Sequence, residues 1–152
     1  MIKKSEILTH ASQAGLRPDI IEKDYVLGWV LAGIHAHTKT AEHWIFKGGT
    51  CLKKCFFGNY RFSEDLDFTL THSEDTVVSL TDSLCEISDW VFEQSGILIP
   101  LESIELKETP SIKKSFSGKI RYVCNVFGGK IGGTKASENF GNIEKSETAD
   151  FV

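Results

Sequence analysis

The sequence has no long apolar run and no excess of positive charge. No stretch approaches the roughly 20 apolar residues that a membrane-spanning helix needs, and residues 1–6 lack the apolar core of a secretory signal. We therefore expect a cytoplasmic protein with no membrane partner. The formal net charge is −4, so any binding to nucleic acid would require a local basic patch rather than an overall attraction.

Cysteine pairs and the common kinase motifs are also lacking. The four cysteines, at positions 51, 55, 85 and 124, do not show the paired short spacings of a zinc ribbon. Cys51 and Cys55 fall on one helical face, and we expect them to be small buried side chains. The chain has no Gly-x-x-x-x-Gly-Lys-Ser/Thr loop and no His-Arg-Asp segment. A kinase or phosphohydrolase is therefore the weaker interpretation of any phosphate site.

What is present is the composition of an ordinary globular domain, 41% hydrophobic and 25% charged over 152 residues. Apolar periodicity and capping signals predict helices over residues 4–15, from residue 17 to about 37, and from an N-cap at Ser73 to Gly96. Strands are expected at 44–46, 66–70, 97–99, 103–106 and 117–123, with a polar connector at 37–43. The pattern predicts an α/β (α+β) fold in which a small mixed sheet packs against N-terminal and central helices.

The most informative segment joins the first two strands. Gly48 and Gly49 directly follow the first strand, and glycine permits a positive φ or a close approach to a ligand. We expect Thr50 to cap a short helix over residues 51–57. Free amides at a helix start favour an anion, so this turn is a candidate phosphate cradle.

Two carboxylates follow on the next strand. The side-chain alternation of a strand puts Asp65 and Asp67 on one face, together with Ser63, and puts Glu64 on the other. Adjacent carboxylates repel, which is tolerable when Mg²⁺ lies between them. The order of cradle and acidic pair predicts a site for a nucleoside triphosphate and Mg²⁺. The alternative is a hairpin with a solvated acidic face.

Basic side chains close to this segment are candidates to offset the charge of a triphosphate. They are Lys47, Lys53, Lys54 and Arg61. Arg61 is the strongest candidate, because its planar fork matches phosphate oxygens and it lies in the loop before the acidic strand.

These residues also carry a resemblance to a known family. The segments Lys47-Gly48-Gly49-Thr50-x-Leu52-x-Lys54 and Arg61-Phe62-Ser63-Glu64-Asp65-Leu66-Asp67 resemble the signature of the AbiEii-like nucleotidyltransferases. That family includes toxins of bacterial toxin–antitoxin and abortive-infection systems and belongs to the polymerase-β-like nucleotidyltransferase superfamily. The block Ile21-Glu22-Lys23-Asp24-Tyr25-Val26-Leu27 is similar to another block of the family. The resemblance covers about residues 15–123.

The resemblance implies transfer of a nucleoside monophosphate from a nucleoside triphosphate to a hydroxyl of RNA, with tRNA the expected acceptor, or of protein. It implies catalytic roles for Asp65, Asp67 and Arg61, Mg²⁺ on the two aspartates, and nucleotide binding by Gly48, Gly49, Thr50, Lys54 and Ser63. A cognate antitoxin is the expected protein partner. The alternative is a non-catalytic remnant that binds nucleotide or antitoxin.

Residues 124–152 depart from the family pattern. The superfamily chemistry needs a third carboxylate on a strand beside the acidic pair, and we identify no such strand after Val123. Glu144, Glu147 and Asp150 are the late candidates. We therefore expect a nucleotidyltransferase-like domain over residues 1–123 and a weakly structured tail over 124–152, in a chain truncated or out of register there and impaired in catalysis. The alternative is a reduced family member that never had those parts.

Two charged features each have two interpretations. Lys23 and Asp24 form either a solvated edge with a local ion pair or a link to the phosphate cradle. The basic positions are 107, 113, 114, 119 and 121. They indicate either an edge hairpin protected by lysines or a patch for an RNA backbone.

Overall fold

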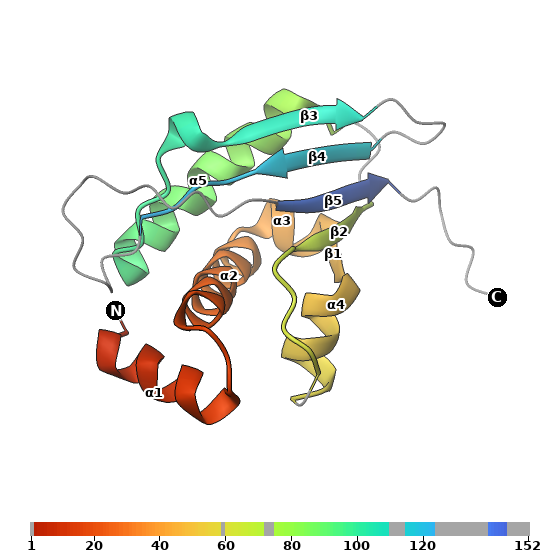
Figure 1. Ribbon diagram of the computed structural model, residues 1–152. Helices are drawn as coiled ribbons and strands as arrows, with labels where there is room; N and C mark the ends of the chain where they lie inside the picture. Colours follow the sequence, from red (N-terminus) through yellow and green to blue (C-terminus); the bar gives the residue numbers. More distant parts are fainter. Residues whose placement is uncertain (1, 59, 72–74, 110–114, 124–139, 146–152) are drawn as a thin grey trace.

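The protein folds around a five-stranded sheet, with helices α2 and α5 packed together beside it (Figure 1). The computed structural model describes residues 2–58, 60–71, 75–109, 115–123 and 140–145. The helices are α1 (Lys4–Ala14), α2 (Pro18–Ala36), α3 (Thr38–His43), α4 (Gly48–Cys51) and α5 (Val77–Ser95), with a π-helical turn η1 (Leu52–Phe56) and a 3₁₀ turn η2 (Leu101–Ser103). The strands are β1 (Trp44–Lys47), β2 (Asp67–Leu70), β3 (Glu105–Thr109), β4 (Ser115–Lys119) and β5 (Phe140–Lys145).

The sheet is mixed, in the order β1-β2-β5-β4-β3. Strands β2 and β5 run parallel, and the other neighbouring strands are antiparallel. This arrangement confirms the predicted α+β class and the small mixed sheet. It also corrects one expectation, because the stretch predicted to be a weakly structured tail contributes β5 to the middle of the sheet.

The first two helices confirm the sequence prediction, and the connector after them does not. Pro18 begins α2 in the first turn, where its missing N–H is not needed. Residues 38–43 form helix α3 rather than an irregular connector, with the Thr40 hydroxyl donating to the carbonyl of Ile34 at 2.6 Å. A buried hydrogen bond to the end of α2 therefore stabilises a helix that has no apolar periodicity of its own.

Helix α5 begins later than expected. Thr76, not Ser73, caps it, with its hydroxyl accepting from the amide of Ser79; residue 73 lies outside the described residues. Gly96 ends the helix at φ +72°, as predicted. The strands expected at 97–99, 103–106 and 117–123 are displaced, because β3 and β4 occupy 105–109 and 115–119 and only an isolated bridge joins Leu98 to Val123.

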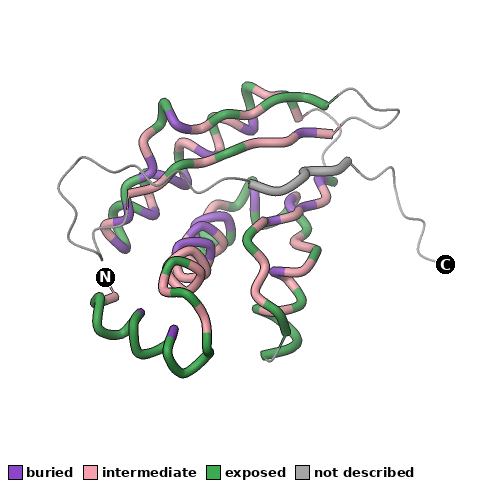
Figure 2. Tube along the Cα trace, viewed as in Figure 1, coloured by how far each residue is buried: buried purple, intermediate pink, exposed green. Residues whose placement is uncertain are grey.

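The core fills the space between the sheet and helices α2 and α5. Figure 2 shows buried positions recurring along both helices and on the sheet. On β2 and the residue before it, Leu66, Phe68 and Leu70 are almost completely buried, each contributing about 1.5–3 kcal/mol relative to an exposed position. Because side chains alternate along the strand, Asp67 and Thr69 face away from that core. The hydrophobic face thus fixes which way the candidate carboxylates point.

Candidate functional site

The glycine turn lies directly against the acidic strand. Helical hydrogen bonding begins at Gly48, whose φ is +79°, and a Cβ atom at this position would overlap the Asp67 side chain. A Cβ on Gly49 would lie 3.2 Å from the hydroxyl of Ser63. The structure therefore brings together four of the residues predicted for the site, and both glycines are needed for this close approach.

Thr50 is not the helix cap that the sequence predicted. The cap position of α4 is Lys47, without a side-chain capping bond, so Thr50 is not an N-cap. Thr50 is almost fully buried, and its hydroxyl donates to the backbone carbonyl of Asp65 at 2.5 Å. This bond joins the glycine turn to the loop that carries the first aspartate. The correction has a simple reason, because the partner lies 15 residues away and local pattern reasoning does not see it.

Asp65 lies in the loop before β2 and Asp67 is the first residue of that strand. Both are half-buried, and the completely buried Leu66 lies between them. Lys47 of β1 is the register partner of Asp67. Burial raises the pKa of Asp65, the charge of Lys23 opposes the increase, and the charges of Asp67 and Glu64 add to it. The pair is thus close enough for mutual repulsion, the condition that a bound cation would relieve.

Most of the predicted cations are engaged by the protein itself. The ammonium of Lys54 lies 2.9 Å from the carboxylate of Asp24 and donates to the Asp24 carbonyl at 3.0 Å. Lys53 donates to the carbonyl of Gly58 at 2.6 Å and lies 4.3 Å from the centroid of the Phe62 ring. Arg61 is exposed and makes no ion pair with any residue that the structure describes.

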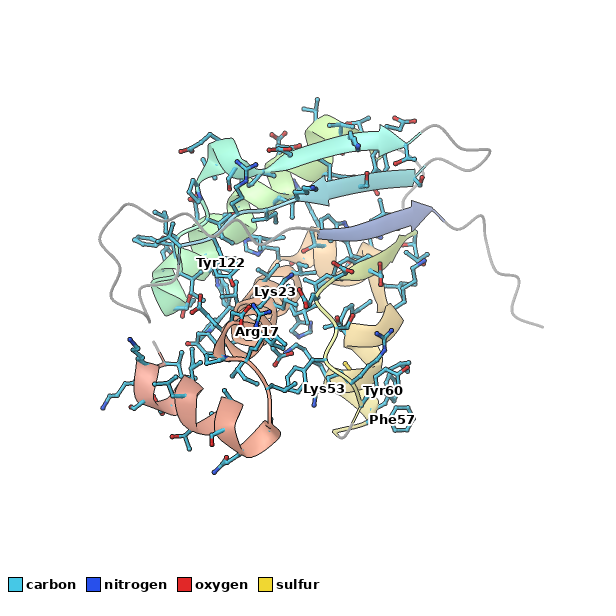
Figure 3. The ribbon with its side chains drawn as sticks, viewed as in Figure 1. Arg17, Lys23, Lys53, Phe57, Tyr60 and Tyr122 are labelled. Carbon is cyan, nitrogen blue, oxygen red and sulfur yellow. The ribbon has the colours of Figure 1, made fainter. Side chains whose placement is uncertain are left out.

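Helix α2 contacts both halves of the candidate site through consecutive residues. Lys23 pairs with Glu64 at 2.7 Å, just before the acidic strand, and Asp24 pairs with Lys54, just after the glycine turn. Figure 3 shows Lys23 on α2, on the side of the helix that faces this segment. The two partners lie 41 and 30 residues away in the sequence, so the charged block does not form a solvated edge with a local pair, and the ion pairs instead tie α2 to the candidate site. Their signal in the sequence was three consecutive charges inside an otherwise apolar helix.

An open cleft of about 380 Å³ lies between α2 and η1. Its lining residues are Asp24, Tyr25, Gly28, Trp29, Ala32 and Lys54. Tyr25 and Trp29 meet edge to face with ring centroids 6.4 Å apart. The cleft shares the Asp24–Lys54 pair with the candidate site, and sequence reasoning did not predict it.

Two carboxylates, not three, are available to a metal in the described part of the chain. No group of three or more His, Cys, Asp and Glu side chains is arranged there to hold an ion. Mg²⁺ is commonly held by one or two carboxylates, with phosphate oxygens and waters completing its shell. Asp65 and Asp67 therefore fit Mg²⁺ delivered with a triphosphate better than a site made by protein alone.

The late acidic residues can be placed only in part. Strand β5 lies beside β2, with residue 144 in register with Thr69. A strand beside the acidic strand does therefore exist after Val123, contrary to the sequence analysis, and it carries Glu144. Glu147 and Asp150 lie outside the described residues.

The three cysteines that the structure describes belong to no metal-binding group of side chains. Cys51 and Cys85 are half-buried, and Cys55 is exposed, which corrects the expectation of buried side chains. Burial is the main cause that raises the pKa of the Cys51 thiol, and the neighbouring Cys55 adds to it. Cys124 lies outside the described residues.

Comparison with known proteins adds one match. The sequence model of the family described as nucleotidyl transferase AbiEii toxin, of a type IV toxin–antitoxin system, matches residues 29–135, more than half of the chain. The match includes the glycine turn and the acidic pair and continues beyond residue 123. No curated protein sequence matches significantly. Among the described residues, no helix has the length and apolar character to cross a bilayer.

Proposed function

The chain belongs to the AbiEii family of nucleotidyl transferase toxins, and we propose that it transfers a nucleoside monophosphate from a nucleoside triphosphate to an RNA hydroxyl. The contact between Gly48 and the Asp67 side chain is the observation that carries the proposal. It puts a backbone turn that can accept phosphate directly beside a carboxylate that can accept a metal, so one triphosphate could meet both.

The donor triphosphate would lie along the glycine turn. Backbone N–H groups of Gly48 and Gly49, at the start of α4, are suited to phosphate oxygens, because the two residues carry no side chains of their own. The Ser63 hydroxyl, which lies next to Gly49, adds a donor. Arg61, exposed and without an ion pair among the described residues, supplies a mobile positive charge for the outer phosphates.

Asp65 and Asp67 would hold Mg²⁺ together with the phosphates. When bound, Mg²⁺ would neutralise charge on the triphosphate and on the leaving pyrophosphate. The protein's contribution is to keep the two carboxylates on one face, through the buried Leu66 between them and the Thr50 bond to the Asp65 carbonyl. Lys23 adds a positive charge close to Asp65.

In the reaction, the acceptor hydroxyl oxygen bonds to the α-phosphorus, and the bond from that phosphorus to its bridging oxygen breaks. Pyrophosphate leaves, and the hydroxyl proton passes to solvent. The Asp67 side chain lies against Gly48, so we assign its carboxylate to the donor end of the site. The acceptor is proposed to be RNA, with tRNA the first to test, and the protein partner a cognate antitoxin.

The test is calorimetric titration of the purified chain with each of the four nucleoside triphosphates, with and without Mg²⁺. We expect Mg²⁺-dependent binding that is lost in Asp65→Asn/Asp67→Asn. Asp89→Asn, which changes an exposed acid on α5, is the matched control and should bind as the wild type does. Incubation with α-labelled triphosphate and tRNA should then label the RNA and release pyrophosphate.

The outcomes separate the alternatives. Binding without pyrophosphate release would identify a non-catalytic nucleotide-binding protein. Binding that survives the double substitution would reject the acidic pair as the metal site. A folded wild-type protein that binds none of the four triphosphates would reject the proposed donor site.

A further inference from the structure

Three aromatic side chains are exposed next to each other at the end of η1. The residues Phe56 and Phe57 are 69% and 58% exposed, and Tyr60 is 36% exposed. The ring centroids of Phe56 and Phe57 are 6.4 Å apart, and those of Phe57 and Tyr60 are also 6.4 Å apart. We call these three rings the aromatic patch. Exposing them to water is unfavourable, since large rings contribute most when buried.

The segment that carries the patch is held in shape by its own contacts. Lys53 donates to the carbonyl of Gly58 and lies over the Phe62 ring, so it closes the turn that presents the rings. The amide of Tyr60 also donates to the carbonyl of Phe57 at 2.9 Å. The rings are therefore presented by a hydrogen-bonded turn, and a ligand that binds to them would lose less conformational entropy of the protein than one that binds to a loose loop.

The charge of this segment is opposite to that of the whole chain. Residues 52–62 contain Lys53, Lys54 and Arg61 and no acidic residue, in a protein of net charge −4. Because Lys54 pairs with Asp24 of α2, the local positive charge comes from Lys53 and Arg61. Arg61, next to Tyr60, makes no ion pair with any described residue. A local excess of positive charge interleaved with aromatic rings is the surface chemistry that binds single-stranded nucleic acid, through stacking of bases and attraction of phosphates.

The patch lies on the segment between the glycine turn and the acidic pair. Figure 3 shows Phe57 and Tyr60 on the outer side of this segment, beyond the helix that follows the turn. Only four residues separate Tyr60 from Asp65 in the sequence. The patch lies at the end of α4 and η1 away from the glycine turn, and residues 61–66 lead from it to Asp67 at the start of β2. A strand that occupied both the patch and the proposed metal site would therefore follow this segment.

We propose that Phe57 and Tyr60 stack on unpaired bases of a single-stranded RNA, with Arg61 contacting its phosphates. Delivery of that strand's hydroxyl to Asp65 and Asp67 rests on the proposed function, and the stacking itself does not. A purely apolar protein partner would cover the rings but would leave the Arg61 charge unpaired, whereas a nucleic acid strand satisfies both.

The test is fluorescence anisotropy of a labelled single-stranded RNA oligonucleotide titrated with the full chain. We expect Phe57→Ala and Tyr60→Ala each to weaken binding by roughly 5- to 150-fold, since base stacking is worth about 1–3 kcal/mol per base. Phe57→Trp should keep the affinity. Phe92→Ala is the matched control, because Phe92 is an aromatic residue on α5 that is 52% exposed, and it should bind as the wild type does.

Circular dichroism of each variant checks that it is folded. A wild type that does not bind the RNA, alanine variants that bind as tightly as the wild type, or an equal loss in Phe92→Ala would overturn the proposal. Equal affinity for the same sequence as a duplex would also overturn it, because paired bases cannot stack on the rings. Stronger binding to single-stranded DNA than to RNA would overturn the assignment to RNA.

The experiment also separates this proposal from the proposed function. Asp65→Asn/Asp67→Asn should keep its RNA affinity and lose Mg²⁺-dependent nucleotide binding. Patch variants that lose RNA affinity in a protein without transferase activity would support the RNA surface and reject the transferase. If the protein is an active transferase and the patch variants keep the RNA affinity of the wild type, the transferase is supported and the RNA surface is rejected.

Discussion

The Asp67 carboxylate occupies the space that a Cβ atom on Gly48 would take. Glycine is therefore required at this position for two reasons. Its φ of +79° is unfavourable for residues with a side chain, and a Cβ atom would overlap the Asp67 side chain. The contact ties the conformation of a turn on one strand to the position of a carboxylate on the next.

Gly48→Ala should destabilise the protein by at least about 1 kcal/mol, because a left-handed conformation alone costs an L-residue about 1–2 kcal/mol. Displacement of the Asp67 side chain should also weaken Mg²⁺-dependent nucleotide binding. Urea unfolding and calorimetry measure the two effects. Gly58→Ala is the control, since a Cβ there would meet nothing within 4 Å, and it should stay within about 0.5 kcal/mol of the wild type. Equal stability of the two variants would contradict the geometry.

Thr50→Val should destabilise the protein by about 0.5–1.5 kcal/mol, the net contribution of a typical hydrogen bond, because this bond is only partly buried. Valine keeps the shape of threonine, so the loss reports on the hydroxyl bond to the Asp65 carbonyl. Thr50→Ser retains the hydroxyl and should bind nucleotide more tightly than Thr50→Val does. Chemical denaturation and nucleotide titration of both variants are the measurements, and identical nucleotide affinities would show that this bond does not position Asp65.

The pair between Lys23 and Glu64 should have a modest coupling energy. The Glu64 side chain is 58% exposed, so solvent screening limits the coupling to about 0.2–1 kcal/mol. Lys23→Glu should destabilise the protein more than Glu64→Lys does, because it adds an acid close to Asp65. The double exchange Lys23→Glu/Glu64→Lys should recover part of that loss in denaturation measurements. If the double variant is only as stable as the sum of the two single effects predicts, the two side chains do not interact.

Stability should change with pH through Asp65. Because burial raises the pKa of this carboxyl in the folded protein, the unfolded chain ionises first as the pH rises. The folded state therefore loses stability between the ordinary pKa of an aspartate and the raised folded pKa, and the loss is complete above that range. Asp65→Asn should have little effect at about pH 3, where both forms are neutral, and should stabilise the protein at pH 7. Unfolding free energies at the two pH values test this, and a variant less stable at pH 7 would contradict it.

The local part of the site could be predicted from the sequence. The apolar run at residues 44–46, the glycines and the alternation around Leu66 define a strand, a turn and a strand without any distant contact. Thr50 could not be interpreted correctly, because the group it bonds lies 15 residues away. The sequence showed that the charged residues Lys23 and Asp24 interrupt an apolar helix. Their ion-pair partners, Glu64 and Lys54, could be identified only from the fold.

Strand β5 was missed for a similar reason. Residues 140–145 include Gly141, Asn142, Glu144 and Lys145, a composition that does not favour a strand by itself. Pairing with β2 on one side and β4 on the other supplies the hydrogen bonds that make it one. Helix α3 likewise depends on a tertiary hydrogen bond rather than on apolar periodicity.

The position of β5 in the sheet has a consequence for synthesis of the protein. This strand comes last among the described strands but lies between β2 and β4, so a nascent chain without it has two separate antiparallel pairs, each with an open edge. Open edges pair readily with other chains. The sheet can close only after residue 145 has left the ribosome, so we expect both open edges to remain exposed to other chains until that point in synthesis.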